Sequence, residues 1–108
     1  MNNAVAPGNT VEIVAPSGGL TSGQPLLVGG MVGISHSKYA EGETAVIDLE
    51  GAYTVPKAGG AAWATGDKLY WDDTNKVFTK TATSNTLAGY AWAVAASGAA
   101  SGVIILRQ

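Results

Sequence analysis

Short apolar runs separated by turn-forming residues are the feature that most restricts how this chain can fold. The sequence has 108 residues, among them 15 glycines and 4 prolines, and the apolar period of an amphipathic helix is hard to find in it. Runs rich in β-branched residues and bounded by Gly, Pro, Asn, Asp or Ser are typical of β-strands. The sequence therefore predicts an all-β fold.

The strands expected from this pattern fill about half of the chain. Asp72–Lys76 is a polar run of turn formers and predicts a hairpin loop. Gly29, Gly30 and Gly33 fall within an apolar run and indicate a bulge or a sharp bend. Many short strands at this spacing form a small single-domain β-barrel or β-sandwich. The expected strands are Thr10–Val14, Pro25–Gly29, Met31–Ser35, Thr44–Leu49, Ala52–Val55, Lys68–Trp71, Val77–Thr79, Leu87–Val94 and Gly102–Arg107.

The sequence also contains a weak internal repeat. Thr21–Leu27 is similar to Ala64–Tyr70, and Met31–Ser35 is similar to Leu87–Ala91. The second pair is further apart than the first, so the second copy has a longer hairpin. We interpret the repeat as two similar turn-plus-strand units around one core, because a solenoid needs at least three units.

The charged side chains are few and unevenly placed. They make up 13% of the chain, and residues 13–37 and 81–106 carry none. A small monomer cannot bury so many residues completely. The neutral surface therefore faces either water, as a Ser/Thr/Gly surface, or a protein, because interface cores are depleted in charge. We expect self-association, with a trimer favoured, because it gives a small domain without disulfides additional buried area.

The charge and the apolar stretches of the chain argue against a nucleic acid or a membrane as its partner. The net charge of −2 does not suit a duplex-binding protein, which needs several cations against phosphates. Cysteine is absent, which excludes disulfides and thiolate chemistry. The longest charge-free apolar stretch, Leu87–Ala96, is too short to span a bilayer as a helix, and the N-terminus lacks the pattern of a signal peptide. We therefore expect neither a nucleic acid nor a membrane as partner.

Nucleotide-binding motifs fail at defined positions. Gly18 and Gly23 have the glycine spacing of a phosphate-binding loop, but Gln24 and Pro25 stand where the lysine and hydroxyl are needed. No Gly-x-Gly pair occurs, so the dinucleotide fingerprint is absent.

Catalytic and metal-binding interpretations are weak. His36 is the only histidine, and a Ser–His–acid triad could be assembled with Asp48 or Glu41 only on paper, because no nucleophile turn is present. We therefore interpret His36 as a surface or turn residue. Three carboxylates bracket one hairpin, and they are more typical of backbone hydrogen bonding in a turn than of a metal site. They are Asp67, Asp72 and Asp73.

The three tryptophans leave one binding alternative open. Exposed aromatic rings are stacking platforms for sugars, so a small carbohydrate- or surface-binding β module is conceivable. The competing interpretation places two of the three rings in the core or in a subunit interface. The rings are those of Trp63, Trp71 and Trp92.

Three stretches of the sequence carry a family resemblance through their order and spacing. Together they are similar to the small cement, or decoration, proteins of tailed-phage capsids, and the likeness covers nearly the whole chain. Such proteins are often labelled as RecA/RadA-type recombinases, a label that requires the phosphate-binding loop missing here. The stretches are Ala6–Asn9 with Val11–Gly23; Val32–Ile34, Gly42-Glu43 and Gly51–Lys57; and Gly66–Asp72 with Leu87–Ala91.

The resemblance implies a structural protein of the virion and not an enzyme. It implies a mostly-β, β-tulip-like fold without a cofactor, made in the host cytoplasm and bound to the outer surface of the expanded head. The implied partner is the major capsid protein, whose subunits such proteins bridge, frequently as homotrimers.

The N-terminal segment is expected to be an extended arm. Residues 1–9 are small and uncharged apart from the terminus and contain Pro7 and Gly8, so they cannot bury enough surface to order themselves. Residues 10–108 are expected to form the single all-β domain. The resemblance implies that the arm is where the capsid is bound. The candidate capsid-binding residues are Asn2, Asn3, Ala4, Val5, Ala6 and Pro7.

Overall fold

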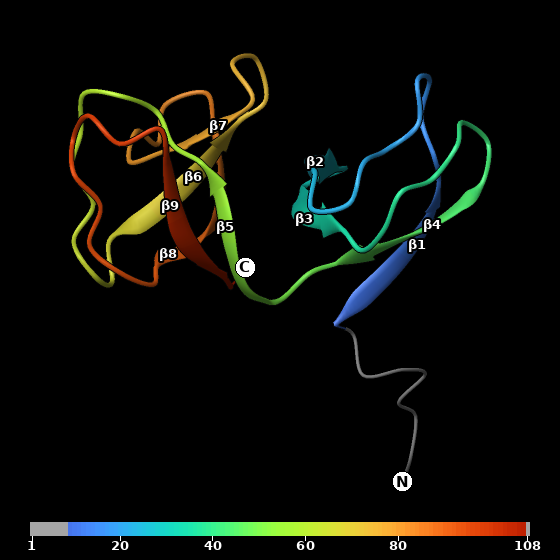
Figure 1. The fold of residues 1–108 in the computed structure, drawn as a ribbon, viewed down its shortest axis with the longest axis horizontal. Helices are drawn as coiled ribbons and strands as arrows, with labels where there is room; N and C mark the ends of the chain where they lie inside the picture. The colour runs from blue at the N-terminus through green and yellow to red at the C-terminus, as the bar shows by residue number, and fades with distance from the viewer. Residues whose placement is uncertain (1–8, 108) are drawn as a thin grey trace, which may run out of the picture.

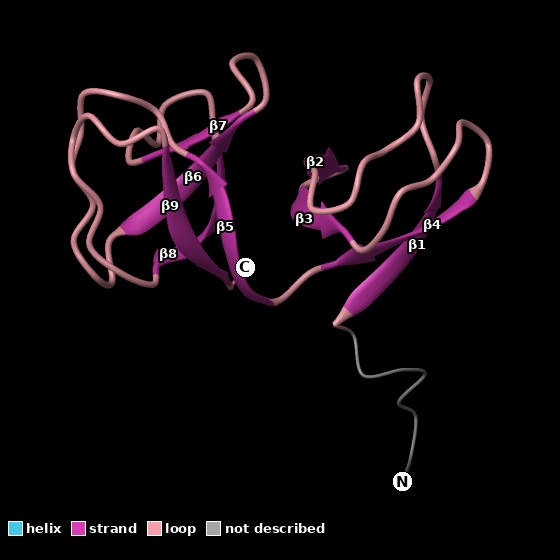
Figure 2. Cartoon of the chain, viewed as in Figure 1, coloured by secondary structure: helices cyan, strands magenta, loops and turns pink. Residues whose placement is uncertain are grey.

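In a computed structural model of the protein, residues 9–107 are described, and their regular structure is entirely β-strand (Figure 1 and Figure 2). No helix long and apolar enough to cross a membrane occurs in this part of the chain. The strands are β1 (Thr10–Val14), β2 (Pro25–Val28), β3 (Met31–Ser35), β4 (Thr44–Asp48), β5 (Gly51–Pro56), β6 (Lys68–Asp72), β7 (Val77–Thr79), β8 (Thr86–Ala91) and β9 (Ser101–Leu106).

The strands form two antiparallel sheets. One sheet has the order β1-β4-β3-β2 and the other β5-β9-β8-β6-β7. Figure 1 shows them as two lobes joined between β4 and β5. The second sheet curls until its edge strands approach, but only the isolated bridge Lys57↔Phe78 links the segment after β5 to β7. The all-β prediction is therefore confirmed, and the architecture is sandwich-like and not a closed barrel.

The expected strands all occur, with shifts at their ends. The largest shift is in β8, which was expected to reach Val94 and ends at Ala91. Beyond this point the Trp92 N–H still donates to the carbonyl of Val103, at 2.9 Å, but the chain then bends. Ala95 pairs instead with Trp63 in an isolated bridge. A tertiary contact therefore ends the strand earlier than local sequence indicates.

The glycines of the first apolar run have two separate roles. Gly29 and Gly30 form the turn between β2 and β3, and Gly29 has a φ of +59°, so they make the sharp bend and not a bulge. Gly33 lies inside β3, where a Cβ would be only 2.3 Å from Cγ2 of Ile47. A register shift does occur, but elsewhere, between β6 and β8 at Leu69/Tyr70.

The internal repeat extends over the whole described chain. When β7 is left out, the strand orders of the two sheets correspond, β1-β4-β3-β2 to β5-β9-β8-β6. The turns correspond as well. Ser35 N–H donates to the Gln24 carbonyl at 2.8 Å, and Ala91 N–H donates to the Asp67 carbonyl at 2.8 Å. The longer hairpin expected in the second copy is the insertion that contains β7.

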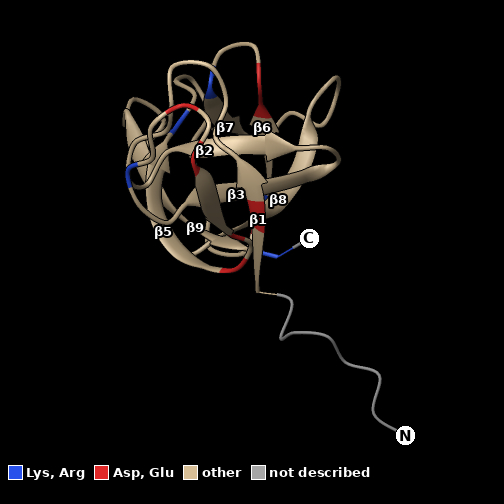
Figure 3. Cartoon of the chain, turned by 90° about the vertical axis from the view of Figure 1, so that its right-hand side faces the viewer, with Lys and Arg blue, Asp and Glu red and all other residues tan. Residues whose placement is uncertain are grey.

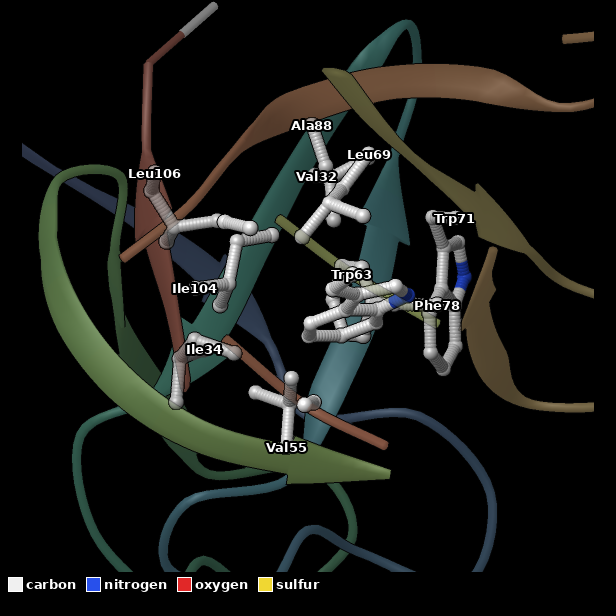
Figure 4. Packing of buried hydrophobic residues seen from close by; sticks show 12 residues of the cluster. Val32, Ile34, Val55, Trp63, Leu69, Trp71, Phe78, Ala88, Ile104 and Leu106 are labelled. Carbon is white, nitrogen blue, oxygen red and sulfur yellow. The ribbon is translucent and has the colours of Figure 1, made fainter. Parts of the chain in front are cut away.

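The buried side chains form two clusters, which corrects the expectation of one core. The smaller cluster lies in the first sheet's lobe and contains Ala15, Leu20, Ala45 and Ile47. The larger cluster joins the sheets, because Val32 and Ile34 of β3 pack into it (Figure 4). The other members of the larger cluster are Val55, Trp63, Leu69, Trp71, Phe78, Ala88, Ala91, Ala95, Ile104 and Leu106.

Candidate functional site

An exposed aromatic side chain marks the outer face of β8 and β9. Tyr90 is paired with Ile105 across the two strands, and Trp92 follows Tyr90 on the same face because side chains alternate along a strand. The Trp92 side chain is 56% exposed. With Thr65 and Arg107 these residues line a mostly apolar hollow of about 370 Å³, which we call the Trp92 hollow.

The chemistry of the Trp92 hollow suits binding to a protein. Trp, Tyr and Arg are the residue types that contribute most at protein interfaces, and charged groups are depleted at interface centres. Residues 81–106 carry no charge, and Val94, two residues beyond Trp92, is 77% exposed. Much of the remaining neutral sequence is buried in the protein itself, in β3 and β9. The sequence indicated Trp92 and the neutral residues 81–106 separately, and only the fold brings Trp92 together with Tyr90 and Arg107.

The histidine pairs with an acid but shows no catalytic arrangement. His36 Nδ1 lies 3.1 Å from Asp48 Oδ2, and the His36 side chain is 64% exposed. Within residues 9–107 no hydrogen bond joins His36 to a serine hydroxyl, and the hydroxyl of Ser35 donates to the Ser37 carbonyl at 2.7 Å. Glu41 accepts from the N–H of Gly18. His36 is thus a surface residue at the end of β3, as expected.

The three carboxylates near the β6–β7 hairpin are used by local structure. Asp67 accepts from Ala64 N–H at 2.8 Å and lies 3.1 Å from Lys80 Nζ. The hydrogen bond from Ala64, and then that from Lys80, lowers the pKa of Asp67 below its ordinary value. Among the described residues no three or more acids or histidines are grouped so that they could hold a metal ion.

The other two carboxylates stabilise the hairpin loop. Asp72 accepts from both the side chain and the backbone N–H of Asn75, and these two hydrogen bonds lower the pKa of Asp72. Asp73 accepts from Lys76 Nζ at 2.9 Å and from Trp71 Nε1 at 3.0 Å. Both hydrogen bonds lower the pKa of Asp73, and the one from Lys76 has the larger effect. The interpretation of these acids as turn residues fits this geometry.

The tryptophans are divided between core and surface. Trp63 is 1% exposed and Trp71 is 2% exposed, and the Trp71 ring packs at a tilt against Phe78 with centroids 4.8 Å apart. Only Trp92 is available to a ligand. A row of aromatic platforms, which would favour the carbohydrate-binding alternative, is not formed by these three residues.

The buried amine of Lys57 has a structural role. Its Nζ donates to the carbonyls of Ala58, at 3.0 Å, and Ser97, at 3.2 Å, and lies 5.9 Å from the centroid of the Trp63 ring. These contacts tie the end of β5 to the loop that precedes β9. All three contacts are internal, so Lys57 is occupied within the fold.

A wider hollow of about 760 Å³ opens where the two sheets meet. Its lining includes Asn9, Met31, Asp48, Glu50 and Arg107, and so combines both signs of charge with one thioether. Asn9 is the last residue of the expected arm, and its carbonyl accepts from Leu49 N–H at 2.9 Å, next to the first pair of β1 and β4. The candidate residues Asn2, Asn3, Ala4, Val5, Ala6 and Pro7 lie outside the described residues.

These observations define a class of protein: a two-sheet β protein whose polar groups serve its turns and whose exposed aromatic face suits binding to another protein. The chain belongs to the phage cement protein family, whose family model matches residues 5–108. Searches of curated proteins and of solved structures returned no match.

The family match confirms the resemblance found in the sequence. Phage cement proteins are structural components and not enzymes, and they decorate the capsid. The protein is therefore a non-enzymatic capsid protein whose place is the capsid surface of the virion.

Proposed function

We propose that the protein binds the outer surface of the expanded phage head and stabilises it by bridging neighbouring major capsid subunits. The observation that carries this proposal is the family match, which spans every described residue. A unit that binds only the expanded lattice adds to the stability of that lattice by mass action.

The repeated fold supports bridging. Two units of the same strand order lie in one chain, so the protein offers two related surfaces at a fixed separation. A single cement unit can then contact two capsid subunits that internal pressure would otherwise separate. Many symmetry-related copies add their contributions.

The protein acts as a homotrimer, and each chain consists of an N-terminal arm and one folded domain. Residues 1–9 act as the capsid-binding arm, through Asn2–Pro7, and residues 10–108 act as the folded domain. Support for the trimer comes from the low charge of the chain and from the exposure of Trp92 and Val94. Light scattering at tens of micromolar is expected to give three times the chain mass, and a monomer would contradict assembly in free solution.

Co-sedimentation tests the proposed binding. Purified protein is mixed with expanded, undecorated capsids and, as a control, with unexpanded procapsids. The proposal predicts saturable pelleting with the expanded capsids only. Equal pelleting with both particles, or none with either, would contradict it. Binding on a glycan array would instead support the carbohydrate-binding alternative.

Deletion of Asn2–Ala6 tests the arm. Ordering an arm costs about 1–2 kcal/mol per residue, so it must gain many contacts at once on the capsid. We expect the truncated protein to fold with unchanged thermal stability and to decorate expanded capsids more weakly. A control replaces the same five residues by Gly and Ser and keeps the length. If the deletion variant decorates as tightly as the full chain, the arm is only a tail.

A further inference from the structure

The four edges of the two sheets are not equally protected. An unprotected edge strand pairs readily with another chain, and proteins block edges with proline, short strands or covering segments. Edge strand β2 contains Pro25, and β5 contains Pro56. The short strand β7 is covered by the segment after β5, because Ala58 N–H donates to the Phe78 carbonyl at 2.9 Å. Strand β1 contains no proline, and no other described segment pairs with its outer edge, which carries a single charge, that of Glu12.

The register of β1 against β4 fixes which backbone groups face outward. The hydrogen bonds Leu49 N–H to Asn9 carbonyl, 2.9 Å, and Ala15 N–H to Glu43 carbonyl, 2.8 Å, place the odd-numbered residues of this segment against β4. In an antiparallel pair the intervening residues point their N–H and C=O groups away from the partner. On β1 these are Thr10, Glu12 and Val14, and no described strand lies on that side.

The side chains of β1 complete a two-faced edge. Thr10, Glu12 and Val14 are exposed, and Val14 is 70% exposed. Val11 and Ile13 lie on the opposite face and pack against the smaller buried cluster. A strand added beside β1 would therefore extend this cluster on one face and meet an apolar and an acidic side chain on the other. Figure 3 shows β1 with its one acidic position in red.

We infer that the free edge of β1 receives an extended segment of a capsid subunit as an added strand. This inference rests on the proposed function and adds a second capsid contact, on the folded domain, to the one proposed for the arm. Backbone hydrogen bonds to residues 10, 12 and 14 supply the pairing, and alternate side chains supply selectivity. The added segment carries a Lys or Arg opposite Glu12 and apolar residues on the face that adjoins Val11 and Ile13.

The charge of Glu12 favours this occupant over a second copy of the chain. Symmetric antiparallel pairing of two β1 strands in full overlap places the two Glu12 side chains directly opposite each other, and like charges in that position are destabilising. Shifting the register avoids this contact but leaves fewer paired residues. A basic capsid segment has neither disadvantage.

A proline substitution tests the inference. Val14→Pro removes one outward N–H of β1 and leaves the bonds to β4 intact, and Thr54→Pro is the matched control at an outward position on β5. Far-ultraviolet circular dichroism and thermal unfolding check that both variants fold. We expect V14P to bind expanded, undecorated capsids about five- to a hundredfold more weakly than wild type, and T54P to bind as wild type.

A charge reversal provides a second variant that keeps the backbone intact. Glu12→Lys is expected to weaken binding to the same capsids at least about fivefold at low salt, and by less at high salt. If V14P and E12K both bind as tightly as wild type, the inference is wrong and the proposed function stands. Equal weakening by V14P and T54P also overturns it. Failure of the wild-type chain to bind overturns both.

Discussion

Among the described glycines, Gly89 of β8 is the position where an added Cβ would be most crowded, and Gly89→Ala is expected to be severely destabilising. A Cβ on Gly89 would lie 2.0 Å from the carbonyl oxygen of Ile105 and 3.0 Å from the nitrogen of Arg107, whereas ordinary contact begins near 3.4 Å. Both obstructing atoms belong to backbone, so no side-chain rotation relieves the overlap. Strands β8 and β9 must move apart by more than about 1 Å.

The magnitude follows from what that movement breaks. Gly89 is paired with Leu106, and the adjoining bond from Arg107 N–H to the Ala88 carbonyl is 3.1 Å. Losing two ladder hydrogen bonds costs about 2 kcal/mol, and overpacking costs a further 1–3 kcal/mol or so. The expected total of about 3–5 kcal/mol is a large share of the roughly 5–15 kcal/mol available to a domain of this size.

Urea unfolding followed by tryptophan fluorescence measures this loss. The matched control is Gly98→Ala, because Gly98 has open space around it and a backbone conformation that alanine tolerates. The control is expected to be neutral or more stable by up to about 1 kcal/mol, through the unfolded chain. A Gly89→Ala variant destabilised by less than about 1 kcal/mol would refute the packing argument.

Three further substitutions test other parts of the structure. Ile34→Ala is expected to cost about 2–5 kcal/mol in urea unfolding, because Ile34 is buried in the cluster that joins the two sheets. Hydrogen bonds from Asn75 lower the folded-state pKa of Asp72, so the stabilisation that they give is present above the unfolded-state pKa and is lost as pH falls through the folded-state pKa. In Asp72→Asn the thermal midpoint should therefore fall less steeply as pH is lowered through that acidic range. Trp92→Ala should leave the far-ultraviolet circular dichroism spectrum unchanged and shift the light-scattering mass from that of a trimer toward that of a monomer, whereas Leu87→Ala, also exposed, should leave the trimer mass unchanged.

Local sequence was sufficient to predict the strands but not their partners. Turn formers such as those in Asp72–Lys76 mark strand ends in every environment, so the positions of all nine strands could be expected. The division into sheets depends on pairings between residues far apart in the chain, such as Thr10 with Asp48 and Tyr53 with Ile104. The early end of β8 and the second buried cluster have the same long-range origin.

The Trp92 hollow and the free edge of β1 were harder to predict, because both depend on contacts between distant parts of the chain. Nothing in the sequence next to Trp63, Trp71 or Trp92 distinguishes the exposed ring from the buried ones, because exposure is decided by which loop covers each ring. The sequence around β1 does contain a usable signal: two of the other edge strands, β2 and β5, contain proline, and β1 does not. That signal gains meaning only when the strand order is known.

A cryo-electron microscopy reconstruction of expanded heads, with and without the protein, tests the central claim most directly. The account predicts difference density on the outer surface that crosses the boundary between neighbouring major capsid subunits, with an added strand beside β1. Density confined to one subunit, or on the inner surface, would contradict bridging of the expanded head.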